Sequence, residues 1–152
     1  MRSILPATDY TSAATLAGEE SKVFRRLWVV AGFGSLLDAP DAFLTHRIGG
    51  VPVLVQNTHG GLRAFVNRCA HRQAPVQIDD FGQRRLACPY HGWVYDDAGR
   101  VRSIPGNEAN YGFDAACTAA LGLEPVALRV VGGLVFVNLA RDPIPLEAQF
   151  HP

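Results

Sequence analysis

The sequence predicts a mostly β protein, an antiparallel sandwich or small barrel with one N-terminal helix. Three observations lead to this prediction. Short runs rich in β-branched and aromatic residues follow one another from Trp28 onward, glycine-containing turn sequences separate them, and only the segment before them has a helical pattern. With 152 residues, of which 48% are hydrophobic and 18% charged, the chain is large enough to bury a core as one domain.

The predicted elements follow in chain order. A helix is expected over residues 11–27, where Thr11 or Ser12 can cap the first turn. Its loose apolar stripe consists of Leu16, Val23, Phe24 and Leu27. Strands are expected at 28–33, 43–48, 51–57, 62–66, 84–88, 93–95, 101–104, 123–131 and 134–139. Residues 105–122 are expected to form a long loop with room for one helical turn, and the proline-rich tail ends without a strand.

Charge and composition exclude several classes of partner. Fourteen basic and fourteen acidic residues give a net charge of zero, and no basic block is present, so neither nucleic acid nor a membrane surface is an expected partner. The first ten residues lack the apolar core of a signal peptide, and no apolar run is long enough to span a bilayer. An odd number of cysteines in a chain of this size favours a reducing cytoplasm and metal ligation over disulfides.

Two short segments each place a cysteine and a histidine close together. CAHR contains Cys69 and His71, and CPYHGW contains Cys88 and His91, which gives the pattern C-x-H-x16-C-x2-H. Both segments are expected on loops of neighbouring hairpins that meet at their tips. Two sites fit two sulfurs and two imidazoles: a tetrahedral zinc, or a two-iron cluster in which both histidines bind one iron. The usual zinc spacing puts both cysteines in one pair, whereas each pair here is mixed.

These motifs resemble the Rieske [2Fe–2S] domain, and specifically the N-terminal domain of the large subunit of Rieske non-haem iron (aromatic-ring-hydroxylating) oxygenases. Residues 5–32 are similar to the entry segment of those subunits, which small Rieske ferredoxins lack. The resemblance implies one Rieske domain over residues 1–152, with a cluster-binding subdomain at about 66–96 and no catalytic domain. The matching segments are LRAFVNRCAHR (62–72), CPYHGWVYDDAGRV (88–101) and GGLVFVNL (132–139).

The resemblance also implies roles for the site residues. Cys69 and Cys88 would hold the inner iron, and His71 and His91 the outer one. In these oxygenases the histidine that matches His91 approaches a carboxylate in the catalytic domain of a neighbouring subunit, so His91 is the expected electron exit.

Two further residues are expected beside the histidines on the docking surface, Arg72 and Trp93, together with His71. For Arg72 a solvated loop charge is an equal alternative, and for Trp93 a place in the core of a strand is the stronger one.

Three positions separate the chain from respiratory Rieske proteins. Those proteins carry a disulfide-forming cysteine where this chain has Ala74 and Tyr90, and a serine where it has Trp93. The differences point to the lower-potential oxygenase type. The oxygenases themselves commonly have glycine where this chain has Gln73.

The residues outside the four ligands supply no second metal site. His46, His59 and His151 are not arranged as the two histidines and a carboxylate that a mononuclear iron needs, so they are expected to be surface histidines. The chain is therefore not expected to be catalytic on its own. Cys117 is expected to be an ordinary buried or half-buried thiol.

The implied function is an oxidoreductase component of a dioxygenase or monooxygenase, with aromatic hydrocarbon catabolism as the expected setting. It would pass single electrons from a reductase or ferredoxin to a mononuclear iron on another domain or chain, and an oligomer is a further expectation. Imidazole ligation raises the potential of such a cluster from about −400 mV to between about −150 and +300 mV, which suits a relay. A free-standing Rieske-type ferredoxin is the alternative.

Overall fold

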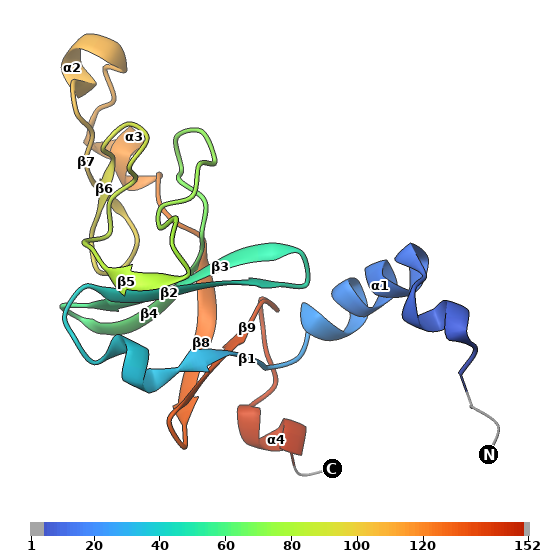
Figure 1. Ribbon diagram of the computed structural model, residues 1–152. Helices are drawn as coiled ribbons and strands as arrows, with labels where there is room; N and C mark the ends of the chain where they lie inside the picture. Colours follow the sequence, from blue (N-terminus) through green and yellow to red (C-terminus); the bar gives the residue numbers. More distant parts are fainter. Residues whose placement is uncertain (1–4, 151–152) are drawn as a thin grey trace.

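The computed structural model describes residues 5–150 and contains two antiparallel sheets (Figure 1). The larger sheet has seven strands in the order β1-β9-β8-β4-β3-β2-β5, and the smaller one pairs β6 with β7. The strands are β1 (Val29–Phe33), β2 (Ala42–Ile48), β3 (Val51–Thr58), β4 (Gly61–Val66), β5 (Phe81–Gln83), β6 (Val94–Tyr95), β7 (Val101–Ser103), β8 (Pro125–Val131) and β9 (Leu134–Asn138). The predicted mostly β, antiparallel fold is confirmed.

The larger sheet curls into a half-barrel. Strand β1 is at one edge of the hydrogen-bonded order, yet it packs against β2 near the other edge. At their contact a Cβ added to Gly32 would lie 2.9 Å from the end of the Leu44 side chain, so a side chain at this position would displace that leucine. Glycine therefore allows the sheet to close on itself here.

The N-terminal helix is shorter than predicted. Helix α1 (Ala13–Glu19) is capped by Ser12, whose hydroxyl accepts a hydrogen bond from the Thr15 amide at 3.2 Å, and it continues as a π-helical turn over Glu20–Phe24. Its apolar stripe is exposed rather than buried in this chain. Figure 1 shows the helix projecting away from the sheets. No helix within residues 5–150 is long and apolar enough to cross a membrane.

Several short helices lie in segments that were expected to be irregular. Residues 105–122 contain α2 (Asn107–Asn110) and α3 (Ala115–Ala119), and the tail contains α4 (Leu146–Phe150). Two 3-10 helices, Ala7–Tyr10 and Gly34–Leu37, complete the set. Helices of four or five residues carry too little periodicity to stand out in a sequence.

The strand predicted at 84–88 is wrong, and side chains explain why. Strand β5 ends at Gln83, and the carbonyl of Arg84 accepts hydrogen bonds from the amide groups of Gln56 (2.6 Å) and Gln77 (3.0 Å). Farther along, only Ala87 forms an isolated bridge, to Val94. The carbonyls of Arg84 and Arg85 are thus paired with side-chain amides instead of a neighbouring strand, while the Leu86 carbonyl still accepts from the Tyr95 amide.

Strands β3 and β4 form a wall shared by two apolar clusters. Val53 and Val55 point into the half-barrel, whereas Leu54 between them points to the other face, as the two-residue period of a strand requires. On that other face Leu54 packs with Phe43 and Phe65 against the segments that carry the paired cysteines and histidines. Burying each such side chain contributes about 1.5–3 kcal/mol to the free energy of unfolding, so this packing holds the two segments in place.

Candidate metal centre

The first pair of donors lies on a loop closed by one buried asparagine. Asn67, which is 5% exposed, accepts hydrogen bonds from the backbone amides of Val76 (2.8 Å) and Gln77 (3.1 Å) and donates to the Gln77 carbonyl (2.7 Å). We call the enclosed segment, residues 67–77, the CAHR loop. Asn67 joins its two ends, so the loop that holds Cys69 and His71 has a fixed base.

Within the CAHR loop the chain makes a tight turn. The Cys69 amide donates to the Ala74 carbonyl at 2.8 Å, and the Gln73 amide donates to the Cys69 carbonyl at 2.9 Å. Gln73 has a φ of 59°, in the left-handed region, at the position where the resembling family commonly has glycine. The turn is therefore kept with glutamine in place, at the cost of local strain.

The second pair lies on the CPYHGW loop, residues 88–93, which the backbone closes by itself. The Cys88 amide donates to the Trp93 carbonyl at 2.8 Å, and the Gly92 amide donates to the Cys88 carbonyl at 3.0 Å. Gly92 has a φ of 72°, and a Cβ there would lie 3.1 Å from Pro105. Glycine is thus required both by the conformation and by the neighbouring proline.

The two loops bring the cysteines together in the interior. Cys69 and Cys88 are both 2% exposed, and the Cys69 thiol is close enough to that of Cys88 to help raise the pKa of Cys88. Burial raises the pKa of the Cys88 thiol, although the backbone amides of Tyr90 and His91 point toward it and act in the opposite direction. Buried thiolates need positive charge beside them, which a metal supplies.

A tyrosine hydroxyl on β6, the strand after the CPYHGW loop, bonds the CAHR loop. Tyr95 donates to Cys69 Sγ at 3.0 Å and accepts a hydrogen bond from the Ala70 amide, also at 3.0 Å. Burial, together with the neighbouring Cys69 thiol, raises the pKa of Tyr95, so its hydroxyl keeps its proton and its role as donor.

The two imidazoles lie together at the surface. The ring centroids of His71 and His91 are 4.7 Å apart; His71 is half-buried and His91 is exposed. Burial lowers the pKa of His71, and the neighbouring His91 and Arg72 act in the same direction. A neutral imidazole is the form that binds a metal.

The four donors therefore form a buried sulfur pair (Cys69 and Cys88) and a surface imidazole pair (His71 and His91). Within residues 5–150, no three His, Cys, Asp or Glu side chains are grouped around one ion position. Two pairs of unlike donors match a cluster with one sulfur-ligated and one nitrogen-ligated iron.

The two residues expected to share the docking surface differ in exposure. Arg72 is exposed, and its guanidinium has no hydrogen bond or ion pair among the described residues. Trp93 is 2% exposed and stacks on His71, with ring centroids 5.0 Å apart and planes 6° apart. Trp93 is therefore a core residue that supports the imidazole from inside, and its ring does not reach the surface.

The other histidines and the third cysteine lie apart from this centre. His46 is exposed on β2, and His59 is exposed in the turn between β3 and β4. His151, also expected to be a surface histidine, lies outside the described residues. The expectation of a buried or half-buried Cys117 is wrong, because this residue lies on α3, an exposed helix at the surface.

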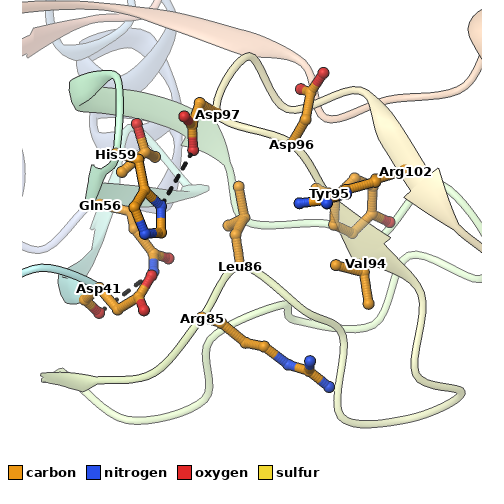
Figure 2. A pocket seen from close by; sticks show the side chains of 11 residues that line it. Asp41, Gln56, His59, Arg85, Leu86, Val94, Tyr95, Asp96, Asp97 and Arg102 are labelled. Carbon is orange, nitrogen blue, oxygen red and sulfur yellow. Dashed lines mark hydrogen bonds and ion pairs between the residues drawn. The ribbon is translucent and has the colours of Figure 1, made fainter.

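A separate pocket of about 530 Å³ opens beside the smaller sheet (Figure 2). Its walls mix both signs of charge, because two arginines (Arg85 and Arg102) and three aspartates (Asp41, Asp96 and Asp97) are among the residues that line it. His59 lies 3.8 Å from Asp97 across its rim. None of the four donors lines this pocket, so it is distinct from the metal centre.

Sequence reasoning missed three residues that shape the centre. They are Asn67, which closes the CAHR loop, Tyr95, which bonds a cysteine, and Tyr111, whose hydroxyl lies 3.3 Å from His71 Nε2. Tyr95 stands four residues after His91, so its place in the motif was a usable signal. Asn67 and Tyr111 contact residues that are 9 and 40 positions away in the sequence, so neither forms part of a local pattern.

Comparison with known proteins gives the class of this fold and site. Residues 27–126 match the family described as the Rieske [2Fe–2S] domain. The chain belongs to this family, and its cofactor is a [2Fe–2S] cluster.

The relatives are oxygenase subunits. The glycine betaine monooxygenase oxygenase subunit of Pseudomonas aeruginosa is 33% identical over 141 residues, 91% of this chain and 32% of that protein. The chlorobenzene dioxygenase subunit alpha of a Cupriavidus species is 30% identical over 93% of this chain and 33% of its own. The quaternary ammonium Rieske monooxygenase CntA superposes with a TM-score of 0.84 at 25% identity, over 97% of this chain and 41% of that one.

Two consequences follow from these similarities. The chain spans about a third of the length of the curated relatives it matches, namely their Rieske part, so the catalytic iron site of such proteins lies outside it. The expectation of aromatic hydrocarbon catabolism needs correction, because the more similar relative and the solved structure are named for quaternary ammonium compounds.

Proposed function

We propose that this chain is the electron-transfer domain of a Rieske oxygenase. It takes single electrons from a reductase or ferredoxin and passes them to a mononuclear iron on another domain or chain. The observation that carries the proposal is that the same two loops supply a buried sulfur pair and a surface imidazole pair. Alone, the chain is an oxidoreductase component without catalysis of its own.

In this proposal Cys69 and Cys88 hold the inner iron, and His71 and His91 hold the outer one. When bound, the cluster supplies a site that stores one electron. The donor chemistry fits, since two thiols are buried together and two imidazoles at the surface can each bind through one nitrogen. The Tyr95 hydroxyl donates a hydrogen bond to the Cys69 sulfur, which stabilises added negative charge there.

His91 is the proposed electron exit. It is exposed, and no hydrogen bond to its ring occurs among residues 5–150. Its free N–H is therefore available to a carboxylate of the acceptor domain. Arg72, exposed and without an ion pair among those same residues, is proposed to contribute to the docking surface.

The proposed domain organisation is one Rieske domain over residues 1–152, with its entry segment at about 5–32 and its cluster-binding subdomain at about 66–96. Similarity over 91% of the chain to an oxygenase subunit supports this reading over the free-standing ferredoxin. A reducing compartment such as the cytoplasm suits the free thiols of all three cysteines.

For the complete protein we propose a quaternary ammonium compound as substrate class. The proposal rests on similarity alone, to relatives named for glycine betaine and for quaternary ammonium compounds. The test is turnover of glycine betaine, choline and carnitine against chlorobenzene and naphthalene by the complete oxygenase with its reductase. Turnover of an aromatic compound only would overturn it.

The electron-transfer proposal is tested by iron and sulfide analysis and by electron paramagnetic resonance of the anaerobically reduced protein. We expect two irons and two sulfides per chain, and loss of the signal in Cys88→Ser. The exposed third cysteine gives a matched control, since Cys117→Ser removes a thiol outside the centre and keeps the cluster. One zinc per chain and no signal would exclude the proposal.

A further inference from the structure

The two imidazoles of the pair have different surroundings. His71 is enclosed on three sides: Trp93 stacks on its face, His91 meets it edge-on, and Tyr111 lies at its outer edge. His91 has ring contacts only with Tyr90 and His71 in the part of the chain that the structure describes. One histidine is thus supported by its own chain, while the other faces outward.

The contact of Tyr111 with His71 is polar and has a defined atom on each side. Tyr111 Oη lies 3.3 Å from His71 Nε2, and the two rings are nearly perpendicular, with centroids 5.5 Å apart. An imidazole that binds iron through one nitrogen carries a proton on the other. With Nε2 facing Tyr111, Nδ1 is the nitrogen left for iron, and the Nε2–H donates to the tyrosine oxygen.

The local structure holds Tyr111 at this place. The Asn107 side chain donates to the Phe113 carbonyl at 2.8 Å and accepts from the Phe113 amide at 3.2 Å. The Asn107 carbonyl accepts from the Tyr111 amide at 2.9 Å. Gly106 and Gly112, both with positive φ, allow the chain to enter and leave this turn. Around α2 the segment is therefore closed on itself, and Tyr111 is fixed by more than its contact with His71.

Further aromatic contacts add to this support. Tyr111 packs edge-on against Trp93 at 5.8 Å and beside Phe113 at 5.4 Å. Trp93 is buried, so it anchors Tyr111 to the core as well as supporting the face of His71. A residue from a segment that follows both metal-binding loops is thus built into the imidazole side of the centre.

We propose that Tyr111 is a positioning residue that engages the outer nitrogen of His71, so that His91 alone is left to bond the electron acceptor. This inference rests on the proposed function, because it takes His71 and His91 as the iron ligands. A carboxylate of the acceptor would have to displace Tyr111 to reach His71, whereas no group of the described chain competes for the His91 ring. His71 and His91 are chemically equal as electron exits, and a residue of this same domain thereby selects His91.

The test is chemical modification of the cluster-loaded protein with diethyl pyrocarbonate, which acylates the imidazole nitrogen that is not bound to metal. Arg72 and Arg85 separate the two histidines in the sequence, so trypsin places them on different peptides for mass spectrometry. In the unchanged protein we expect His91 to be acylated first and His71 to be protected.

Tyr111→Phe keeps the ring and removes the hydroxyl, so acylation of His71 should become about two- to tenfold faster while that of His91 stays unchanged. Tyr90→Phe is the matched control, because the Tyr90 ring lies beside that of His91, with centroids 3.9 Å apart, and makes no hydrogen bond to either imidazole. If Tyr111→Phe cannot be loaded with cluster, Asn107→Ala loosens the same tyrosine and should have the same effect on His71.

Equal acylation of both histidines in the unchanged protein, or an unchanged rate at His71 in the variants, would overturn the inference. Iron analysis of each sample keeps this failure separate from failure of the proposed function. Protein with two irons and equally reactive histidines contradicts only the role of Tyr111. Protein that binds no iron contradicts the electron-transfer proposal itself.

Discussion

The CAHR loop and the CPYHGW loop present the same two donor types by different means. The CAHR loop is closed by a side chain, Asn67, and contains a residue in a strained backbone conformation, Gln73. The CPYHGW loop is closed by backbone hydrogen bonds and relies on Gly92 at its turn. The CAHR loop therefore depends on particular side chains, whereas the CPYHGW loop depends on a glycine that has no side chain. Substitutions in each loop should have different effects for this reason.

The largest effect is expected for Asn67→Ala. Two buried amides and one buried carbonyl lose their partner, which should lower the free energy of unfolding by about 2–4 kcal/mol and reduce cluster content. Thermal unfolding and iron content measure both effects. Asn57→Ala is the control: it removes hydrogen bonds to Leu37 and Ala39 far from the loops and should cost less while cluster content stays unchanged. Equal cluster loss in both variants would contradict a special role for Asn67.

Gly92→Ala should have the next largest effect, because it combines a left-handed backbone with a close contact to Pro105. We expect a loss of about 1–2 kcal/mol and slower incorporation of the cluster, measured by denaturant unfolding and by the visible spectrum during reconstitution. Gly132→Ala isolates the first cause, since Gly132 also has a positive φ but no atom near an added Cβ. A Gly132→Ala variant as impaired in cluster loading as Gly92→Ala would refute the local explanation.

Tyr95→Phe tests the hydroxyl that donates a hydrogen bond to the Cys69 sulfur. Removing a donor to the Cys69 sulfur disfavours the reduced state, so the reduction potential should fall by about 20–60 mV, the equivalent of a hydrogen bond of roughly 0.5–1.5 kcal/mol. Spectroelectrochemical titration measures the shift. Tyr10→Phe removes an exposed hydroxyl away from the centre and should leave the potential unchanged. A rise in potential for Tyr95→Phe would contradict the assigned direction of this hydrogen bond.

The smallest effect is a gain. Gln73→Gly should relieve the left-handed strain of the CAHR loop and raise the free energy of unfolding by up to about 1 kcal/mol, less the weak 3.4 Å contact of the glutamine amide with the Cys69 carbonyl. Asp41→Gly is the comparison, since Asp41 is the other non-glycine residue with positive φ among residues 5–150. A destabilised Gln73→Gly variant would mean that the glutamine side chain, rather than the backbone, holds the turn.

The sequence allowed the β-rich fold and the paired donors to be predicted, because both have local signatures: glycine turns between β-branched runs, and fixed spacings within CAHR and CPYHGW. The interactions that hold the donors could not be found in this way. Gln56 and Gln77, whose side-chain amides bond the Arg84 carbonyl where a strand was predicted, lie 28 and 7 residues from Arg84 in the sequence. Tyr111 lies 40 residues from His71. Such pairs are set by the folded chain and leave no periodic pattern.

The shared wall of β3 and β4 has a consequence for electron transfer. Leu54 and Phe65 pack in the same cluster as Cys69 and Cys88 of the metal centre. Their strand neighbours Val53, Val55 and Ala64 are buried in the half-barrel. A metal centre supported by close-packed side chains changes shape little when its charge changes, so the reorganisation energy of each electron-transfer step is small. Large-to-small substitutions inside the half-barrel are remote from any iron ligand. They should therefore slow electron transfer before they change the reduction potential of the centre.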